Sequence, residues 1–298
     1  MASKRKSSPL GPAPTRLRQI ALVAENLEKA RHLLTTVIGT EVIFEDPAVE
    51  QWGLKNILVP IGGDIIEVVS PFLPTAPATR HLTKHGPGGY MLIMQTHHPS
   101  ALKRLANIKA HHLAQPIFTH STPESDMVQY HPKGIPGGVI PELDSHREHP
   151  EHPDPLRERF SPWHAAGPGE RYAVYREGMR RAGGLWLVSV MVRLKDGDGG
   201  VEGAARRWED VFGVQRGEGS GEVVFTNAKM QFLRGEQGRK DGLVEVGIAV
   251  EGRGMRDGIL ARAREEGLGV EGDVVDMLGI SWRFMVRDPN EEERMSKL

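Results

Sequence analysis

The chain has 298 residues, 39% of them hydrophobic, and a formal net charge of −1. No excess of basic residues is present to neutralise phosphates, and no stretch reaches the ~20 apolar residues of a membrane span, so we expect neither a nucleic-acid nor a membrane partner. The absence of cysteine excludes disulfides, thiolate nucleophiles and cysteine-ligated zinc, and we expect a cytoplasmic protein with room for two domains.

The first predicted elements form a unit of one strand, one helix and three more strands. Residues 1–14 are predicted to be a disordered tail, since they carry Lys, Ser and Pro without an apolar segment. An apolar strand at residues 17–24 precedes a helix at residues 27–38, which Asn26 caps and Gly39 ends. The strands that complete the unit are predicted at residues 41–45, 56–60 and 65–70.

The same order of elements then starts again. A strand is predicted at residues 90–96 and a helix at residues 100–112. Three strands follow, at residues 116–120, 127–130 and 138–143. Two similar units indicate a duplicated block and one domain at residues 15–145.

A proline-rich, charged segment separates the two halves of the chain. We interpret residues 146–182 as a linker, with a short helix near its end. The second half repeats the order less clearly, and we predict a divergent domain of the same kind at residues 183–298. Its predicted elements are strands at 186–194, 222–226, 229–233, 243–250, 273–277 and 280–286, with helices at 201–212 and 255–266.

Three segments resemble a known family. RQIALVAENLEKARHLLTTVIG resembles the opening strand and helix of vicinal-oxygen-chelate (glyoxalase-like) proteins. IIEVVSPFLPTAPATRHLTKHGPGGY resembles the stretch that joins their two units, and MVQYHPKGIPGGVIPELDSH is similar to the closing strands of methylmalonyl-CoA epimerases. The resemblance implies an α+β fold of tandem domains, each with two βαβββ units that form a half-open barrel.

The resemblance also implies a metal site with one ligand from the first and last strand of each unit. Carried over by position, three ligands fall on Gln19, Glu67 and Glu142. The remaining position holds Met91, where the family has histidine, and a thioether is a poor ligand for such cations. Two alternatives stay open: a site for Mg, Mn, Co, Ni or Zn completed by water or substrate, and the remnant of a lost site.

Several side chains also carry information of their own. Glu67 interrupts an otherwise apolar strand, so it either has a buried partner or faces water at a sheet edge. His131 follows a strand within the family-like HPK sequence, and we expect it to contact substrate beside Met91. The histidines of the linker, at positions 146, 149 and 152, are interrupted by prolines and are interpreted as solvated.

The favoured function is a metal-assisted isomerase, epimerase or lyase acting on a small, oxygen-rich carbonyl metabolite. Glu67 and Glu142 would bind the metal or carry a proton at the carbon beside the carbonyl. The alternative is a protein that binds a small molecule without chemistry. In the second half, Val188 and Gln231 correspond roughly to Gln19 and Glu67, which favours a scaffold role there. A homodimer is compatible with both functions.

Overall fold

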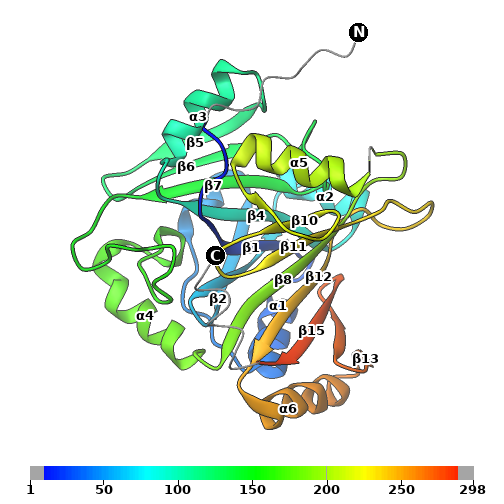
Figure 1. Cartoon of the computed structure of the whole chain (residues 1–298). Helices are drawn as coiled ribbons and strands as arrows, with labels where there is room; N and C mark the ends of the chain where they lie inside the picture. Colours follow the sequence, from blue (N-terminus) through cyan, green and yellow to red (C-terminus); the bar gives the residue numbers. More distant parts are fainter. Residues whose placement is uncertain (1–9, 199, 288–298) are drawn as a thin grey trace.

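Two β-sheets with helices around them make up the α+β fold of this protein (Figure 1). The computed structural model describes residues 10–198 and 200–287, so most of the tail expected at residues 1–14 lies outside the described residues. The two halves have a similar order of elements, as the tandem fold expected from the sequence requires. No helix in the described part of the chain is long and apolar enough to cross a membrane.

The first sheet has seven strands in the order β2-β3-β1-β4-β7-β6-β5. Its two units join through their first strands, since β1 is antiparallel to β4 and each of these is parallel to the last strand of its own unit. The elements of this half are β1 (Thr15–Val23), α1 (Leu27–Leu33), the π-helix η1 (Leu34–Ile38), the 3-10 helix η2 (Pro47–Trp52), β2 (Leu54–Ile61), β3 (Asp64–Pro71), α2 (Pro77–His85), β4 (Gly88–Thr96), α3 (Ala101–Ala110), β5 (Pro116–Ser121), β6 (Ser125–Tyr130) and β7 (Ile140–His146).

The second sheet has eight strands in the order β13-β14-β15-β12-β8-β11-β10-β9. Here β8 is antiparallel to β12, so the two units meet as they do in the first sheet. The elements of this half are β8 (Leu185–Arg193), α5 (Val201–Phe212), β9 (Gln215–Arg216), β10 (Glu222–Val224), β11 (Lys229–Leu233), β12 (Gly242–Val250), α6 (Gly252–Glu265), β13 (Gly269–Glu271), β14 (Val274–Met277) and β15 (Ile280–Val286).

The start and end of the first helix follow from local chemistry. The Asn26 side-chain oxygen accepts the backbone N–H of Lys29 at 2.9 Å, which satisfies one free donor of the first turn. The helix then continues through η1 and ends at Gly39, whose φ of 81° is readily adopted by glycine. The helix predicted at residues 27–38 is therefore confirmed.

The strand expected at residues 41–45 is wrong. This segment makes only one isolated bridge, between Phe44 and Leu58. Asp46 then accepts the N–H of Ala48, and Pro47 starts η2, so the chain leaves the sheet edge as a helical turn. The first sheet consequently has seven strands where the repeated pattern predicted eight.

The two sheets share one hydrophobic core. Leu17, Ile20 and Leu22 of β1 belong to the same buried cluster as Val190 and Val192 of β8. Arg262 of α6 also donates to the Val37 carbonyl of η1, at 3.1 and 2.9 Å, which fastens the second half to the first. The opposite faces of the sheets point away from this core. We call the face of the first sheet that carries Gln19 the first cup, and the face of the second that carries Glu245 the second cup.

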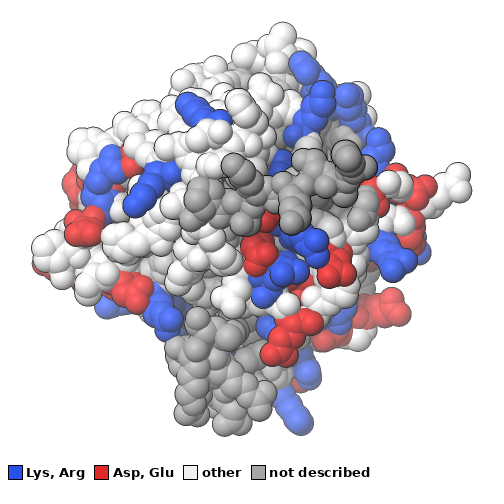
Figure 2. Space-filling model, turned by 45° about the horizontal axis from the view of Figure 1, so that its top comes forward, with Lys and Arg blue, Asp and Glu red and all other residues white. Residues whose placement is uncertain are grey.

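Charged side chains of both signs are spread over the surface. Figure 2 shows acidic and basic side chains mixed over one face, with a group of Lys and Arg at its upper right edge. The net charge of −1 thus arises from interspersed positive and negative groups.

The segment between β7 and β8 packs against the first cup. It contains η3 (His164–Ala166), η4 (Gly169–Arg171) and α4 (Tyr172–Arg181), which confirms the short helix predicted near its end. Trp163 and Tyr175 of this segment are buried against Ala21 and Ile65 of the first sheet. This part of the linker therefore covers one end of the cup. The solvated position expected for His152 is wrong, since it is buried.

Candidate functional site

The curvature of the first sheet brings its two edges together. Trp52, at the end of η2 beside β2, meets Phe118 of β5 edge to face, with ring centroids 5.6 Å apart. Strands β2 and β5 are the outermost strands of the sheet. The contact between Trp52 and Phe118 closes this side of the cup, and the 38% exposed Trp52 gives the rim an apolar side chain that a ligand can reach.

Strand register places all four positions of the predicted metal site on the inner face of this cup. Gln19 pairs with Ile93, which pairs with Glu142, so these residues form one row across the sheet. Glu67 and Met91 both pair with Ala21 and form the next row. Side chains alternate along a strand, so residues two apart in one strand point to the same face. Gln19 and Ala21 are two apart in β1, so the two rows share one face of the sheet.

Glu67 is held by two side-chain amides. Asn56 Nδ2 donates to Glu67 Oε1 at 2.6 Å, and Gln19 Nε2 donates to Glu67 Oε2 at 2.9 Å. Burial raises the pKa of Glu67, while these two hydrogen bonds lower it. The half-buried carboxylate thus points inward, and the water-facing edge position considered for it is wrong.

The orientation of Gln19 is fixed from the other side by Trp163. The indole Nε1 of Trp163 donates to Gln19 Oε1 at 2.7 Å. An indole N–H only donates, so the amide oxygen of Gln19 must face Trp163 and its NH2 group must face Glu67. A cation between Gln19 and Glu67 would need the oxygen on that side, so the residues as arranged do not fit the predicted metal site.

Glu142 forms an acidic pair with its neighbour on the same face of β7. Burial, assisted by the charge of Glu67, raises the pKa of Glu142 to about 7, against hydrogen bonds from Gln129 and Asp144. Burial and the proximity of Glu142 also raise the pKa of Asp144 well above its usual value. Two buried, neighbouring carboxyl groups do not both ionise readily, so each raises the pKa at which the pair loses its protons.

Two histidines, His146 of β7 and His164 of the linker, connect Asp144 to a cavity. His164 Nε2 lies 3.5 Å from Asp144 Oδ2, and His146 Nε2 lies 3.0 Å from His164 Nδ1. Burial lowers the pKa of His164 to about 4. Both histidines line a cavity of about 360 Å³ between the linker and the end of β7. The sequence singled out neither His164 nor Asp144, although Asp144 lies two residues from Glu142 on the same strand face.

The two residues expected to contact substrate lie in different places. Met91 is on the inner face, next to Ala21 and half-buried. His131 follows β6, and its Nδ1 accepts the backbone N–H of Lys133 at 2.9 Å. In the described part of the chain, no hydrogen bond or ion pair joins His131 to Glu67 or Glu142, so its contact with substrate stays a prediction.

The second cup has different chemistry at the matching positions. By register, Ser189, Gln231, Glu245 and Arg283 stand where the first cup has Gln19, Glu67, Met91 and Glu142. Ser189, rather than Val188, therefore matches Gln19. Arg283 binds both carboxylate oxygens of Glu245, at 2.9 and 3.0 Å. This ion pair neutralises the acid, whereas the carboxyl groups of the first cup have only neutral hydrogen-bond partners.

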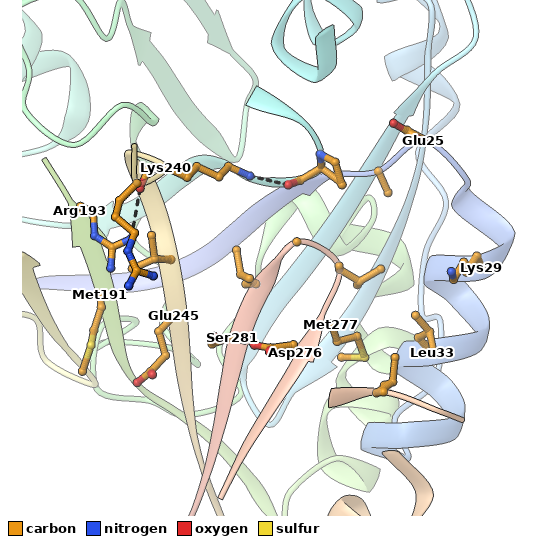
Figure 3. A pocket seen from close by; sticks show the side chains of 18 of the residues that line it. Glu25, Lys29, Leu33, Met191, Arg193, Lys240, Glu245, Asp276, Met277 and Ser281 are labelled. Atoms are coloured by element: carbon orange, nitrogen blue, oxygen red, sulfur yellow. Dashed lines mark hydrogen bonds between the residues drawn. The ribbon is translucent and has the colours of Figure 1, made fainter. Parts of the chain in front are cut away.

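A cavity of about 730 Å³ lies between the second cup and α1 (Figure 3). Lys240 crosses it and donates to the carbonyl of Pro87 at 2.6 Å, while its own carbonyl accepts from Arg193 at 3.3 Å. Four basic side chains line the cavity, against three acidic ones, and one of these acids, Glu245, is paired with Arg283. This volume is within the range of small-molecule sites, while the scaffold role expected for the second half stays a prediction. The polar residues at its wall are Glu25, Asn26, Lys29, Arg193, Arg239, Lys240, Glu245, Asp276 and Ser281.

Comparison with known proteins gives similarity in structure alone. No protein-family model matches the sequence, and no curated protein does. A hypothetical protein from Staphylococcus aureus is similar over 92% of this chain and 100% of its own, with a TM-score of 0.55 and 10% identity. At this identity the similarity shows the fold alone, and it spans both halves.

Two epimerases are similar to part of the chain. Methylmalonyl-CoA epimerase from Streptomyces coelicolor, in a complex with 2-nitronate-propionyl-CoA, covers 45% of this chain with 98% of its own, at 18% identity and a TM-score of 0.40. The enzyme from Mycobacterium tuberculosis covers 44% with 87% of its own, at 20% identity and a TM-score of 0.38.

Proposed function

We propose that this protein is a glyoxalase-like enzyme that moves a proton on a small carbonyl compound bound in the first cup. The observation that carries the proposal is the pair of inward carboxyl groups, Glu67 and Glu142, which differ in how they are held. Glu67 accepts two amide hydrogen bonds, and Glu142 has a pKa of about 7. Paired titratable groups in contrasting surroundings are typical of acid–base sites.

Glu142 is suited to take up and return a proton near neutral pH. A group with a pKa close to the working pH is present in both protonation states and transfers protons efficiently. In the proposed step, the carboxylate of Glu142 removes the proton on the carbon beside the carbonyl, and the C–H electron pair moves into an enolate. Return of a proton to the opposite face of that carbon gives the epimer. With a hydroxyl group on that carbon, protonation of the former carbonyl carbon and loss of the hydroxyl proton give the isomer.

Glu67 supplies the fixed negative charge of the site and, for an epimerase, the second proton carrier. The amides of Gln19 and Asn56 stabilise its charged form, so it stays closer to ionised than burial alone would allow. Its charge also raises the pKa of Glu142. The rim residues Trp52 and Phe118 suit a substrate with an apolar part next to its carbonyl group.

A metal at Gln19, Glu67 and Glu142 remains an alternative form of this proposal. It requires Gln19 to release Trp163 and turn its oxygen toward Glu67, at the cost of both hydrogen bonds. Met91 adds no suitable donor for Mg, Mn, Co, Ni or Zn. When bound, such an ion would polarise the carbonyl oxygen.

The second candidate function is binding without chemistry. The position of the linker favours it. Trp163 is completely buried, and its indole N–H is hydrogen-bonded to the amide oxygen of Gln19, which is therefore not available to a ligand. A cup that is partly filled by its own chain is compatible with storage or sequestration of a small apolar ligand beside Met91.

The two functions are separated by proton exchange with solvent. The purified protein is incubated in D2O with a panel of small 2-oxo acids, 2-hydroxy ketones and 2-substituted acyl thioesters, and loss of the α-proton signal is followed by NMR. We expect exchange of at least one compound, with a large loss of rate in Glu142→Gln and Glu67→Gln. The control is Glu271→Gln, the same change on an exposed strand of the second half.

Binding of a panel compound by wild-type protein, without exchange, would favour the second candidate. Exchange that persists in both glutamine variants would refute the assignment of Glu67 and Glu142.

A further inference from the structure

A turn of the linker brings two imidazoles and a carboxylate together. The N–H of His152 donates to the carbonyl of His149 at 2.9 Å, and the two rings lie 5.3 Å apart. Glu151 lies between them in the sequence. One side-chain ligand atom from each of these three residues lies within 4.8 Å of the other two. The group borders the cavity of about 360 Å³ that also contains His146 and His164.

His152 is built into this turn as metal-binding histidines are. Its ring is buried, with 8% of the side chain exposed, and its Nδ1 lies 2.7 Å from Glu158 Oε1. A carboxylate at Nδ1 fixes the tautomer that carries its proton there, which leaves the lone pair of Nε2 for a ligand. In the described residues, Nε2 of His152 has no hydrogen-bond partner.

The other two residues of the group can adjust to an ion. His149 and Glu151 are exposed, so their side chains can rotate without disturbing the core. The Nδ1 of His149 accepts the N–H of Glu151 in a hydrogen bond of 3.2 Å, and an ion bound at this nitrogen would replace that hydrogen bond. Around an ion with bonds of ~2.0–2.2 Å the three donor atoms would lie closer together than the 4.8 Å within which they lie here.

A second group, of His97, His98 and Glu148, has the same types of side chain but weaker support. The side chains of His98 and Glu148 are 72% and 81% exposed. No carboxylate is found at Nδ1 of either histidine in the described part of the chain. This group is therefore the natural comparison for the turn at residues 149–152.

We propose that His149, Glu151 and His152 bind a divalent transition-metal ion of the zinc class. Two imidazoles and one carboxylate suit Zn²⁺, Co²⁺ and Ni²⁺ rather than Mg²⁺ or Ca²⁺, which prefer oxygen donors. Three protein ligands leave a fourth position for water. Glu158 also accepts a hydrogen bond from Arg16 through its backbone carbonyl, at 2.9 Å. Through His152, Glu158 and Arg16, the ion thus holds the linker against the first sheet at a point N-terminal to Trp163.

The test is a titration of the metal-stripped full-length protein with Co²⁺, followed by its visible absorption, and with Zn²⁺ in competition. We expect one tightly bound ion per chain, lost in His149→Ala and in His152→Ala. Glu158→Gln should weaken binding by ~10–100-fold, because it removes the carboxylate that orients His152. Mg²⁺ should not compete.

Two controls keep the result specific. His98→Ala should leave the titration unchanged, and a loss of binding in this variant with retention in His149→Ala would overturn the proposal. His152 is buried, so its variant is checked by circular dichroism, while the exposed His149→Ala tests the site without that risk. Wild-type protein without a bound Co²⁺ ion at micromolar concentrations would also overturn it. Glu142→Gln should bind normally, which separates this site from the first cup.

Discussion

Trp163 donates its indole hydrogen to Gln19 Oε1 at 2.7 Å, across 144 residues of sequence. This contact turns the amide nitrogen of Gln19 toward Glu67, where it donates at 2.9 Å. A linker residue therefore determines which atom of Gln19 faces the cup. The first cup is consequently arranged around hydrogen-bonded carboxyl groups, and the linker is part of its wall.

The contact between Trp163 and Gln19 should be measurable as a coupling. Trp163→Phe leaves the buried amide oxygen of Gln19 without its donor, and we expect a loss of about 1–3 kcal/mol in the free energy of unfolding. Gln19→Leu and the double variant complete a double-mutant cycle, measured by urea unfolding. A coupling energy near zero would contradict the structural role given to this hydrogen bond.

Stability should fall as pH rises through the range set by Glu142. Its pKa is raised from an ordinary value of 4.5 to about 7 in the fold, so the native state holds a proton that the unfolded state has released. The stabilisation is complete below about pH 4.5 and is lost progressively toward pH 7, with a slope of at most about 1.4 kcal/mol per pH unit.

Urea unfolding of wild-type protein and Glu142→Gln at intervals from pH 5 to 8 checks this expectation. The glutamine variant stays neutral, so its advantage over wild type should grow with pH. A difference that is constant across this range would show that Glu142 titrates normally.

Met91→His should create a metal site in the first cup. An imidazole at this position joins Glu67 and Glu142 on the same face and supplies the nitrogen donor that the thioether lacks. In a His149→Ala/His152→Ala background, which removes the proposed linker site, we expect Zn²⁺ to raise the melting temperature of the Met91→His variant.

The matched protein with Met91 in the same background should melt at the same temperature with and without Zn²⁺. A Zn²⁺-dependent rise in that protein would instead support a metal site at Gln19, Glu67 and Glu142.

Removing one partner of the ion pair in the second cup should destabilise the fold, because it leaves the other charge buried without a partner. Arg283→Met leaves Glu245, which is 8% exposed, without its bidentate partner. We expect a loss of about 1–2 kcal/mol, less than for a fully buried pair because Arg283 is one-third exposed. The double variant with Glu245→Met should recover most of it in urea unfolding. A double variant as unstable as Arg283→Met alone would point to packing rather than charge.

Local patterns predicted most of the elements because local chemistry decides them. The helical spacing after Asn26 and the glycine at position 39 set the bounds of α1 and η1, and the helix predicted at residues 201–212 coincides with α5. The strand expected at residues 41–45 failed because Phe44 packs against the linker instead of extending the sheet. That packing partner lies far along the chain, where no local pattern indicates it.

The sequence by itself determined the repeated order of strands and helices, and the family resemblance that it carries placed Gln19, Glu67 and Glu142 in one site. Only the tertiary structure decided what those side chains meet. Trp163 reaches Gln19 from the linker, and burial beside Asp144 raises the pKa of Glu142. Hydrogen-bond direction and protonation depend on neighbours brought together by folding, and a periodic pattern records only which face a side chain occupies.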